Sequence, residues 1–137
     1  MPDLVPVHGG LEEPVSRTVP ISRRKQFLQE AAEFPRIELS SGDLSTVYRI
    51  ADGTLSPLTG GMDEETWHYV LDNDALDYGF RHYAWTAPIS FPATDDEVKK
   101  LNVGRSAALT HNGAIIAVMH VSSIFDWDKA KHVERFY

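Results

Sequence analysis

Histidine and aspartate are the residues of this chain that could bind a metal ion or transfer a proton. The six histidines show neither H-x-x-H nor H-E-x-x-H spacing, so no metal-binding helix is indicated. Asp126 and Asp128 could ligate a divalent ion, but a turn followed by a helix N-cap explains both residues and is the favoured interpretation. His120 lies in an apolar stretch and is interpreted as a core or interface residue. We therefore predict no metal site.

His8-Gly9-Gly10 is a tripeptide of the type that forms an oxyanion hole in lipases. Such a loop works with a nucleophile on a G-x-S-x-G elbow, and the sequence contains none. The sequence also lacks G-x-G-x-x-G and G-x-x-x-x-G-K-[ST], the patterns that hold nucleotide phosphates. A turn in an extended segment explains the tripeptide better. We predict no catalytic and no substrate-binding residue.

The composition is that of a single water-soluble domain. The chain has 137 residues, of which 42% are hydrophobic and 24% charged, and it contains no cysteine, which fits a reducing compartment. No stretch approaches the roughly 20 apolar residues that span a bilayer, and the N-terminus does not have the pattern of a signal peptide. We expect a cytoplasmic protein without a membrane contact. The net charge of −7 argues against nucleic acid as a partner.

The first forty residues predict an arm, a helix and a strand. Residues 1–21 carry four prolines and a glycine pair, which predicts an extended arm. Ser22 is the predicted N-cap of a helix that ends near Glu33, before a proline. Residues 36–40 alternate polar and apolar side chains, which predicts a half-buried strand. The predicted core face of the helix comprises Phe27, Leu28, Ala31 and Ala32.

Two further helices are expected on either side of a turn. Gly53 is predicted to end the first of them, and Asp63 to cap the second. Met62 and Trp67 then have the spacing of a hydrophobic staple. The predicted core faces comprise Leu44, Val47, Tyr48 and Ala51 in one helix, and Trp67, Val70 and Leu71 in the other.

The turn between these helices, residues 53–62, has an unusual sequence. Pro57 fixes its own φ, and Gly60 and Gly61 permit positive φ values. The turn either positions the next helix or presents backbone N–H groups to a ligand. The structural role is favoured, because no phosphate-binding pattern accompanies the turn.

The remaining sequence is expected to be rich in strands. Apolar residues at every second position predict one strand over 83–91, with Pro88 marking an edge or a bulge. Thr94 and Glu97 form a capping box that begins a short helix. Tyr83, Trp85 and Phe91 could stack bases, but their spacing is typical of a core face.

The strongest turn signal of the sequence is Asn112-Gly113. It predicts a hairpin between strands at 105–110 and 114–121, the second of which we expect to be covered on both faces. Asp128 is predicted to cap a last helix, with Ala130, Val133 and Phe136 directed inward. Together these elements define an α+β protein with a small, twisted mixed sheet or partly closed barrel.

Several short motifs occur in a particular order along the chain. They are Leu4-Val5-Pro6, His8-Gly9-Gly10, Val15-Ser16-Arg17, Ser56-Pro57-Leu58-Thr59-Gly60 with Met62, Pro88-Ile89, Leu101-Asn102-Val103-Gly104, Ile124-Phe125, Asp128-Lys129 and Glu134 to Tyr137. In this order the chain resembles the N-terminal domain of ATP sulfurylase (sulfate adenylyltransferase) over essentially its whole length. Two positions depart from the pattern: Gly61 replaces an aromatic residue, and Ser16 replaces an asparagine.

The resemblance implies a PUA-like fold for residues 1–137 as one domain. It also implies that ATP, Mg²⁺ and sulfate are held by a separate catalytic domain with Q-x-R-N-P, H-x-x-H and G-R-D-H motifs, which this sequence lacks. The parent enzyme would make adenosine 5′-phosphosulfate and pyrophosphate, whereas this chain is expected to be inactive alone and to hold no cofactor. Its expected partners are the catalytic domain and further copies in a homo-oligomer. The family-motif residues expected to have a structural or interface role are His8, Gly9, Gly10, Arg17, Ser56, Pro57, Leu58 and Gly60.

Two other functions stay open at this point. The first is a free-standing PUA-like binding module for a protein or an RNA, with RNA disfavoured by the negative charge. Salt-dependent RNA binding would distinguish this binding module from a domain of ATP sulfurylase. The second is a pyrophosphate-releasing enzyme with an unfamiliar site, which the lack of a phosphate-binding pattern argues against.

Overall fold

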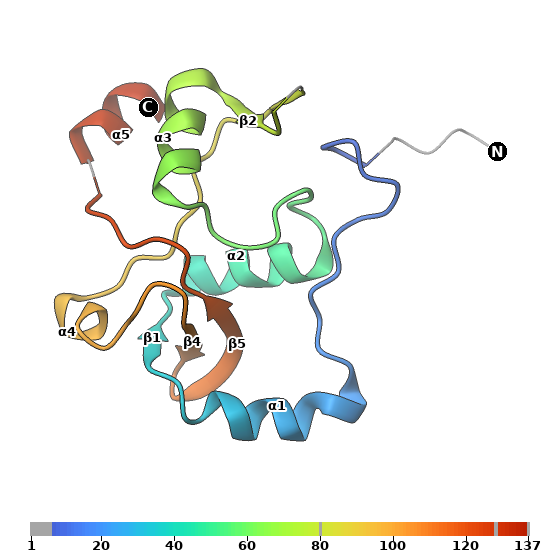
Figure 1. Ribbon diagram of the computed structural model, residues 1–137, viewed down its shortest axis with the longest axis vertical. Coiled ribbons are helices and arrows are strands. Elements are labelled where there is room, and N and C mark those ends of the chain that lie inside the picture. The colour runs from blue at the N-terminus through green and yellow to red at the C-terminus, as the bar shows by residue number, and fades with distance from the viewer. Residues whose placement is uncertain (1–6, 80, 128, 137) are drawn as a thin grey trace. The chain divides into compact units, whose positions relative to one another are not determined.

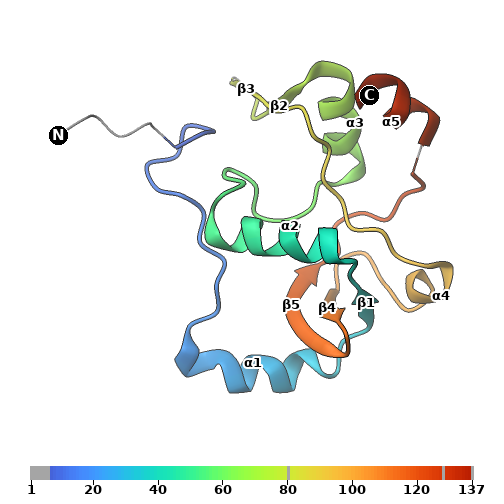
Figure 2. The ribbon, with the colours of Figure 1, turned by 180° about the vertical axis from the view of Figure 1, so that it is seen from behind.

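The chain folds into two compact units that alternate along the sequence. The computed structural model describes residues 7–79, 81–127 and 129–136, without the side chains at positions 131, 135 and 136. Unit 1 comprises Met1–Gly60 and Ala93–Val121, and unit 2 comprises Gly61–Pro92 and Ser122–Tyr137. Figures 1 and 2 show the elements of the two units from two sides.

Unit 1 is built on a three-stranded sheet. Its strands are β1 (Arg36–Glu38), β4 (Ser106–His111) and β5 (Ala114–His120), in the order β1-β4-β5. β4 pairs in parallel with β1 and antiparallel with β5. Asn112 and Gly113 join β4 to β5 with φ values of 49° and 80°, the left-handed backbone that Asn-Gly hairpins favour. The predicted hairpin is confirmed.

The helices of unit 1 are η1 (Ile21–Arg23), α1 (Arg24–Ala31), α2 (Ser41–Asp52) and α4 (Asp95–Val98). Figures 1 and 2 show the sheet lying between α1 and α2. The capping box of α4 is present as predicted, with reciprocal hydrogen bonds between the N-cap and the third helical residue. α2 ends, also as predicted, at a glycine in the left-handed conformation.

The predicted start of the first helix was wrong. The Arg23 N–H donates to the Pro20 carbonyl at 2.9 Å, so a 3-10 turn begins at Ile21 and passes into α1. Ser22 therefore lies inside this turn, and α1 has no side-chain cap. Of the predicted core face only Ala31 is buried, Phe27 is half-buried, and the other two residues are exposed.

The core of unit 1 centres on β4 rather than on β5. The four inner residues of β4 are buried, because strands flank β4 on both sides. The central residues of β5 are only half-buried, because β5 lies at the edge of the sheet. The prediction that 114–121 is covered on both faces was wrong. In α2, Ile50 takes the core position predicted for Tyr48, which is 52% exposed.

Unit 2 contains α3 (Glu64–Asn73), β2 (Ala75–Asp77), β3 (His82–Ala84) and α5 (Lys129–Phe136). The side chain of Asp63 caps α3 as predicted, accepting a hydrogen bond from the third helical N–H at 2.8 Å. The core of unit 2 comprises the three residues predicted in α3 (Trp67, Val70 and Leu71), together with Met62 and Leu76.

The strand predicted over 83–91 is shorter in the structure. β3 pairs only with β2, a strand that the sequence did not predict, and the last ladder bond runs from the Trp85 N–H to the Asp74 carbonyl. From Tyr83 to Ala87 the odd-numbered residues are nevertheless half-buried, and the even-numbered residues between them are exposed. The alternation thus predicted the buried face correctly, but hydrogen-bonded pairing ends where β2 ends.

The last helix turns a different face inward from the one predicted. Ala130 and Val133 are exposed, whereas the His132 ring stacks on Trp67 of α3 with a centroid distance of 5.8 Å. The predicted cap Asp128 and the Phe136 side chain lie outside the described residues.

The α+β class is confirmed, with short helices, an extended arm over residues 7–20 and two small sheets. The described strands do not close into a barrel. No helix in the described residues has the length and apolar composition needed to cross a membrane.

Candidate functional site

The arm and the turn after α2, which carry most of the family-motif residues, meet in unit 1. Ser56 is buried, and its hydroxyl makes two hydrogen bonds. The hydroxyl donates to the Gly53 carbonyl at 2.6 Å and accepts from the Val15 N–H at 2.8 Å. Two residues after Val15 in the arm, the Arg17 N–H donates to the Ala51 carbonyl of α2 at 3.0 Å. The arm is therefore attached to the end of α2 through its backbone, as its path in Figure 1 illustrates.

Two glycines let these segments approach each other closely. Gly53 has a φ of 89°, and a Cβ on it would lie 2.5 Å from the Val15 carbonyl oxygen. Gly9 has a φ of 88°, and a Cβ there would lie 2.5 Å from the Pro57 side chain. Real Cβ atoms do not come so close to other heavy atoms, so both contacts require glycine.

The structure brings some of the predicted motif residues together and leaves others apart. Gly9, Ser56 and Pro57 meet at the junction just described, and Leu58 is buried beside them in sequence. Arg17 joins through its backbone while its side chain is exposed. His8 and Gly10 are exposed, and Gly60 is half-buried.

The glycine pair in the turn does not use the positive φ values that glycine permits. Neither Gly60 nor Gly61 has a positive φ, and it is Gly53 that takes the left-handed conformation. Gly61 serves packing within unit 2, because a Cβ there would lie 3.3 Å from the Phe91 ring. Gly60 has open space around it.

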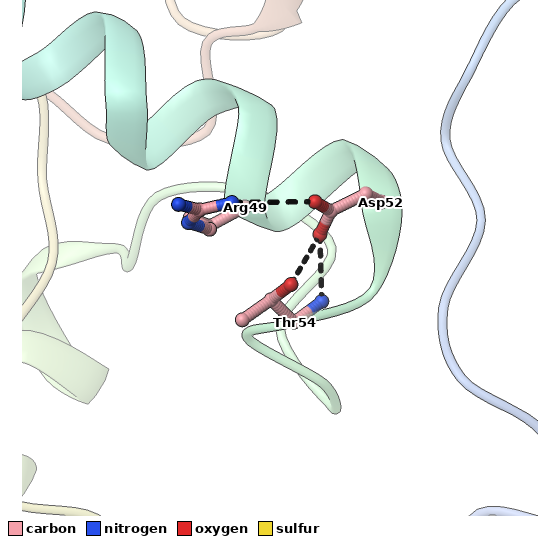
Figure 3. A network of polar contacts seen from close by, with 3 residues as sticks. All are labelled: Arg49, Asp52 and Thr54. Atoms are coloured by element: carbon pink, nitrogen blue, oxygen red, sulfur yellow. Dashed lines mark hydrogen bonds and ion pairs between the residues drawn. The ribbon is translucent and has the colours of Figure 1, made fainter.

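A polar network that the sequence analysis missed lies beside the turn. Asp52 Oδ1 accepts hydrogen bonds from the Thr54 hydroxyl at 2.6 Å and from the Thr54 N–H at 2.9 Å (Figure 3). The Arg49 guanidinium lies 3.8 Å from the other carboxylate oxygen. The bonds from Thr54 hold the pKa of the Asp52 carboxyl below its ordinary value. An aspartate two residues before a threonine at a helix end is the local signal that could have revealed this turn.

A second carboxylate network joins three segments of unit 1. Glu38 accepts hydrogen bonds from the Thr110 hydroxyl at 2.7 Å and from the Asn112 N–H at 2.8 Å, which lower the pKa of its carboxyl. The Glu38 N–H in turn donates to Glu97 at 2.7 Å. These contacts connect β1, the β4–β5 hairpin and α4 across long sequence separations, so no local pattern could have predicted them.

The carboxylates of both networks bind other groups of the protein. In each, the carboxylate is occupied by hydrogen-bond donors of the fold, and the buried hydroxyls of Ser56 and Thr110 both have protein partners. In the part of the chain that the structure describes, no three histidine, aspartate or glutamate side chains lie close enough together to hold a metal ion.

Comparison with known proteins identifies the class of this fold. The PUA-like domain family matches residues 5–137, so the chain belongs to that family. Its relatives include the sulfate adenylyltransferase of Pyropia yezoensis, which is 38% identical over 138 residues that cover 100% of this chain and 31% of the relative.

Two further relatives carry the same name. The sulfate adenylyltransferase of Hyperthermus butylicus is 36% identical over 95% of this chain and 32% of its own length. That of Nostoc punctiforme is 31% identical over 99% of this chain and 34% of its own length. The chain thus spans about a third of the length of the curated relatives that it matches. The resemblance deduced from the motifs is confirmed.

Proposed function

We propose that this chain is the N-terminal, non-catalytic domain of a sulfate adenylyltransferase. In this role it packs against the catalytic domain and supports assembly of an oligomer in the cytoplasm. The observation that carries the proposal is the coverage: sulfate adenylyltransferases match essentially the whole chain, while the chain accounts for only about a third of each. ATP, Mg²⁺ and sulfate would then be bound by the remaining two-thirds.

The contacts of the motif residues support a structural role. The Ser56 hydroxyl uses both its donor and an acceptor position within the fold. Gly9 and Gly53 are needed for close packing of the arm. The Ser56 hydroxyl is therefore engaged within the fold, and the two glycines have no side chain that could act as a nucleophile or a general base.

The proposal predicts that the chain is inactive alone and active when completed. We expect no pyrophosphate release from ATP and sulfate by the purified chain. We expect release when the chain is fused to the part of the Pyropia yezoensis enzyme outside the matched region. A coupled pyrophosphate assay measures both, with that part alone as the control. Turnover by the chain alone would contradict the non-catalytic role.

A free-standing PUA-like binding module is the second candidate. The observation that favours it is that the PUA-like family matches residues 5–137. The net charge of −7 makes a protein a better partner than RNA. Fluorescence anisotropy with labelled RNA at several salt concentrations separates the two functions. Tight, salt-dependent binding would favour the binding module.

A further inference from the structure

The segment formed by η1 and α1 carries an exposed surface that is both apolar and basic. Ile21, Arg24, Lys25 and Leu28 follow helical spacing and lie on one side of the segment. We call these four residues the Ile21 surface. Ile21 is 82% exposed and Leu28 is 41% exposed, although both are large apolar side chains. α1 packs near β5 and buries Ala31, whereas all four residues of the Ile21 surface are exposed, so this surface is not part of the core of unit 1.

The charges on this surface, and that of the neighbouring Arg23, are locally unfavourable. Arg23, Arg24 and Lys25 are exposed and make no ion pair with any residue that the structure describes. They stand at the N-terminus of α1, where the helix dipole disfavours cations. α1 has neither a side-chain cap nor an acidic residue in its first turn, whereas α2, α3 and α4 have both. Stability of the isolated fold therefore does not explain these three cations.

We propose that the Ile21 surface binds an acidic protein segment whose carboxylates alternate with apolar side chains. Carboxylates of such a segment would pair with Arg24 and Lys25, and its apolar side chains would cover Ile21 and Leu28. The charge complementarity is specific to this place, because the chain as a whole is acidic. The inference goes beyond the proposed function, which assigns no role to these residues of unit 1.

Two other occupants fit the surface less well. A membrane-surface helix needs a broad apolar face, and this short segment offers two large apolar side chains. A nucleic acid would meet the same cations but would leave Ile21 uncovered, and the acidic remainder of the chain would repel its phosphates.

The charge contribution is tested with a labelled synthetic peptide in which glutamate and leucine alternate at helical spacing. Fluorescence anisotropy with the full 137-residue chain measures its affinity. We expect the double variant Arg24→Glu/Lys25→Glu to weaken binding about tenfold or more. The matched control Lys99→Glu/Lys100→Glu changes the net charge equally at another exposed site, and we expect a change below about twofold. Equal losses in both variants, or no binding by the unaltered chain, would overturn the proposal.

The apolar contribution is tested with Ile21→Ser, for which Val103→Ser is the control because Val103 is 61% exposed. We expect a several-fold weaker affinity for the first variant only, with unchanged circular dichroism in both. An equal effect of the two variants would contradict an apolar anchor at Ile21.

Other occupants give their own readouts in the same experiment. Phosphatidylserine vesicles and poly(dT) are offered to the unaltered chain, and its self-association is measured by sedimentation velocity. We expect weaker binding to both probes than to the peptide, and no dissociation of an oligomer by Arg24→Glu/Lys25→Glu. Stronger binding to either probe, or an oligomer that this variant disrupts, would overturn the proposal in favour of that occupant.

Discussion

At the scale of single residues, Gly53 has the most constrained environment in the junction between the arm and α2. It ends α2 in the left-handed conformation, its carbonyl accepts the Ser56 hydroxyl, and its missing side chain leaves room for the Val15 carbonyl. Three separate requirements therefore meet at one position, and only glycine satisfies all of them.

The first prediction concerns this glycine. Gly53→Ala is expected to lower the free energy of unfolding by about 2 kcal/mol or more, because a positive φ and a close backbone contact both oppose a Cβ. Gly60→Ala is the matched control, since Gly60 has no positive φ and open space around it. We expect a change within about 0.5 kcal/mol for the control. Urea unfolding measures both, and similar losses would contradict the assignment.

At the scale of elements, the Glu38 carboxylate links β1 to the β4–β5 hairpin. The Thr110 hydroxyl and the Asn112 N–H donate to it and thereby lower the pKa of the carboxyl in the folded state. A carboxyl whose pKa is lower in the folded state than in the unfolded state stabilises the fold above its unfolded pKa of about 4.3. This stabilisation is lost as the pH falls through the folded-state pKa.

The second prediction follows from this linkage. Glu38→Gln is expected to lower Tm clearly at about pH 7 and progressively less below about pH 4, where the native carboxyl also becomes protonated. Glu33→Gln removes the same charge from an exposed residue whose side chain has no described hydrogen bond, and it serves as the control. Differential scanning calorimetry across this pH range measures both. A Tm difference for Glu38→Gln that does not change with pH would count against the network.

At the scale of the whole molecule, the two units interrupt each other in sequence. Unit 1 is closed by residues on both sides of 61–92, so that segment forms a loop of unit 1 when unit 2 is unfolded. When unit 2 unfolds, residues 61–92 become a flexible loop. Closing such a loop adds an entropic cost to the folding of unit 1. We therefore expect the two units to unfold together.

The third prediction uses the positions of the tryptophans. All three, Trp67, Trp85 and Trp127, lie in the segments of unit 2, so their fluorescence reports on that unit, whereas circular dichroism reports on both. Ile37→Ala removes a buried side chain of unit 1 and is expected to cost about 2–5 kcal/mol. We expect both probes to show the same lowered midpoint. A fluorescence midpoint that stays at its original value would show that the units unfold independently.

The sequence by itself determined the features that depend on neighbouring residues. The caps at Asp63 and Thr94, the Asn112-Gly113 hairpin and the end of α2 at Gly53 all rest on local hydrogen bonds and backbone preferences. The ordered motifs were also sufficient to place the chain in the PUA-like family of sulfate adenylyltransferase relatives.

Only the tertiary structure decided which segments became partners. It placed β4 at the centre of the sheet and β5 at its edge, and it ended β3 at Ala84 because β2 offers no further residues. It also gave Ser56 its partner in the arm, 41 residues away in sequence. Burial and hydrogen bonding between distant segments depend on which surfaces meet in space, and local patterns carry no record of that.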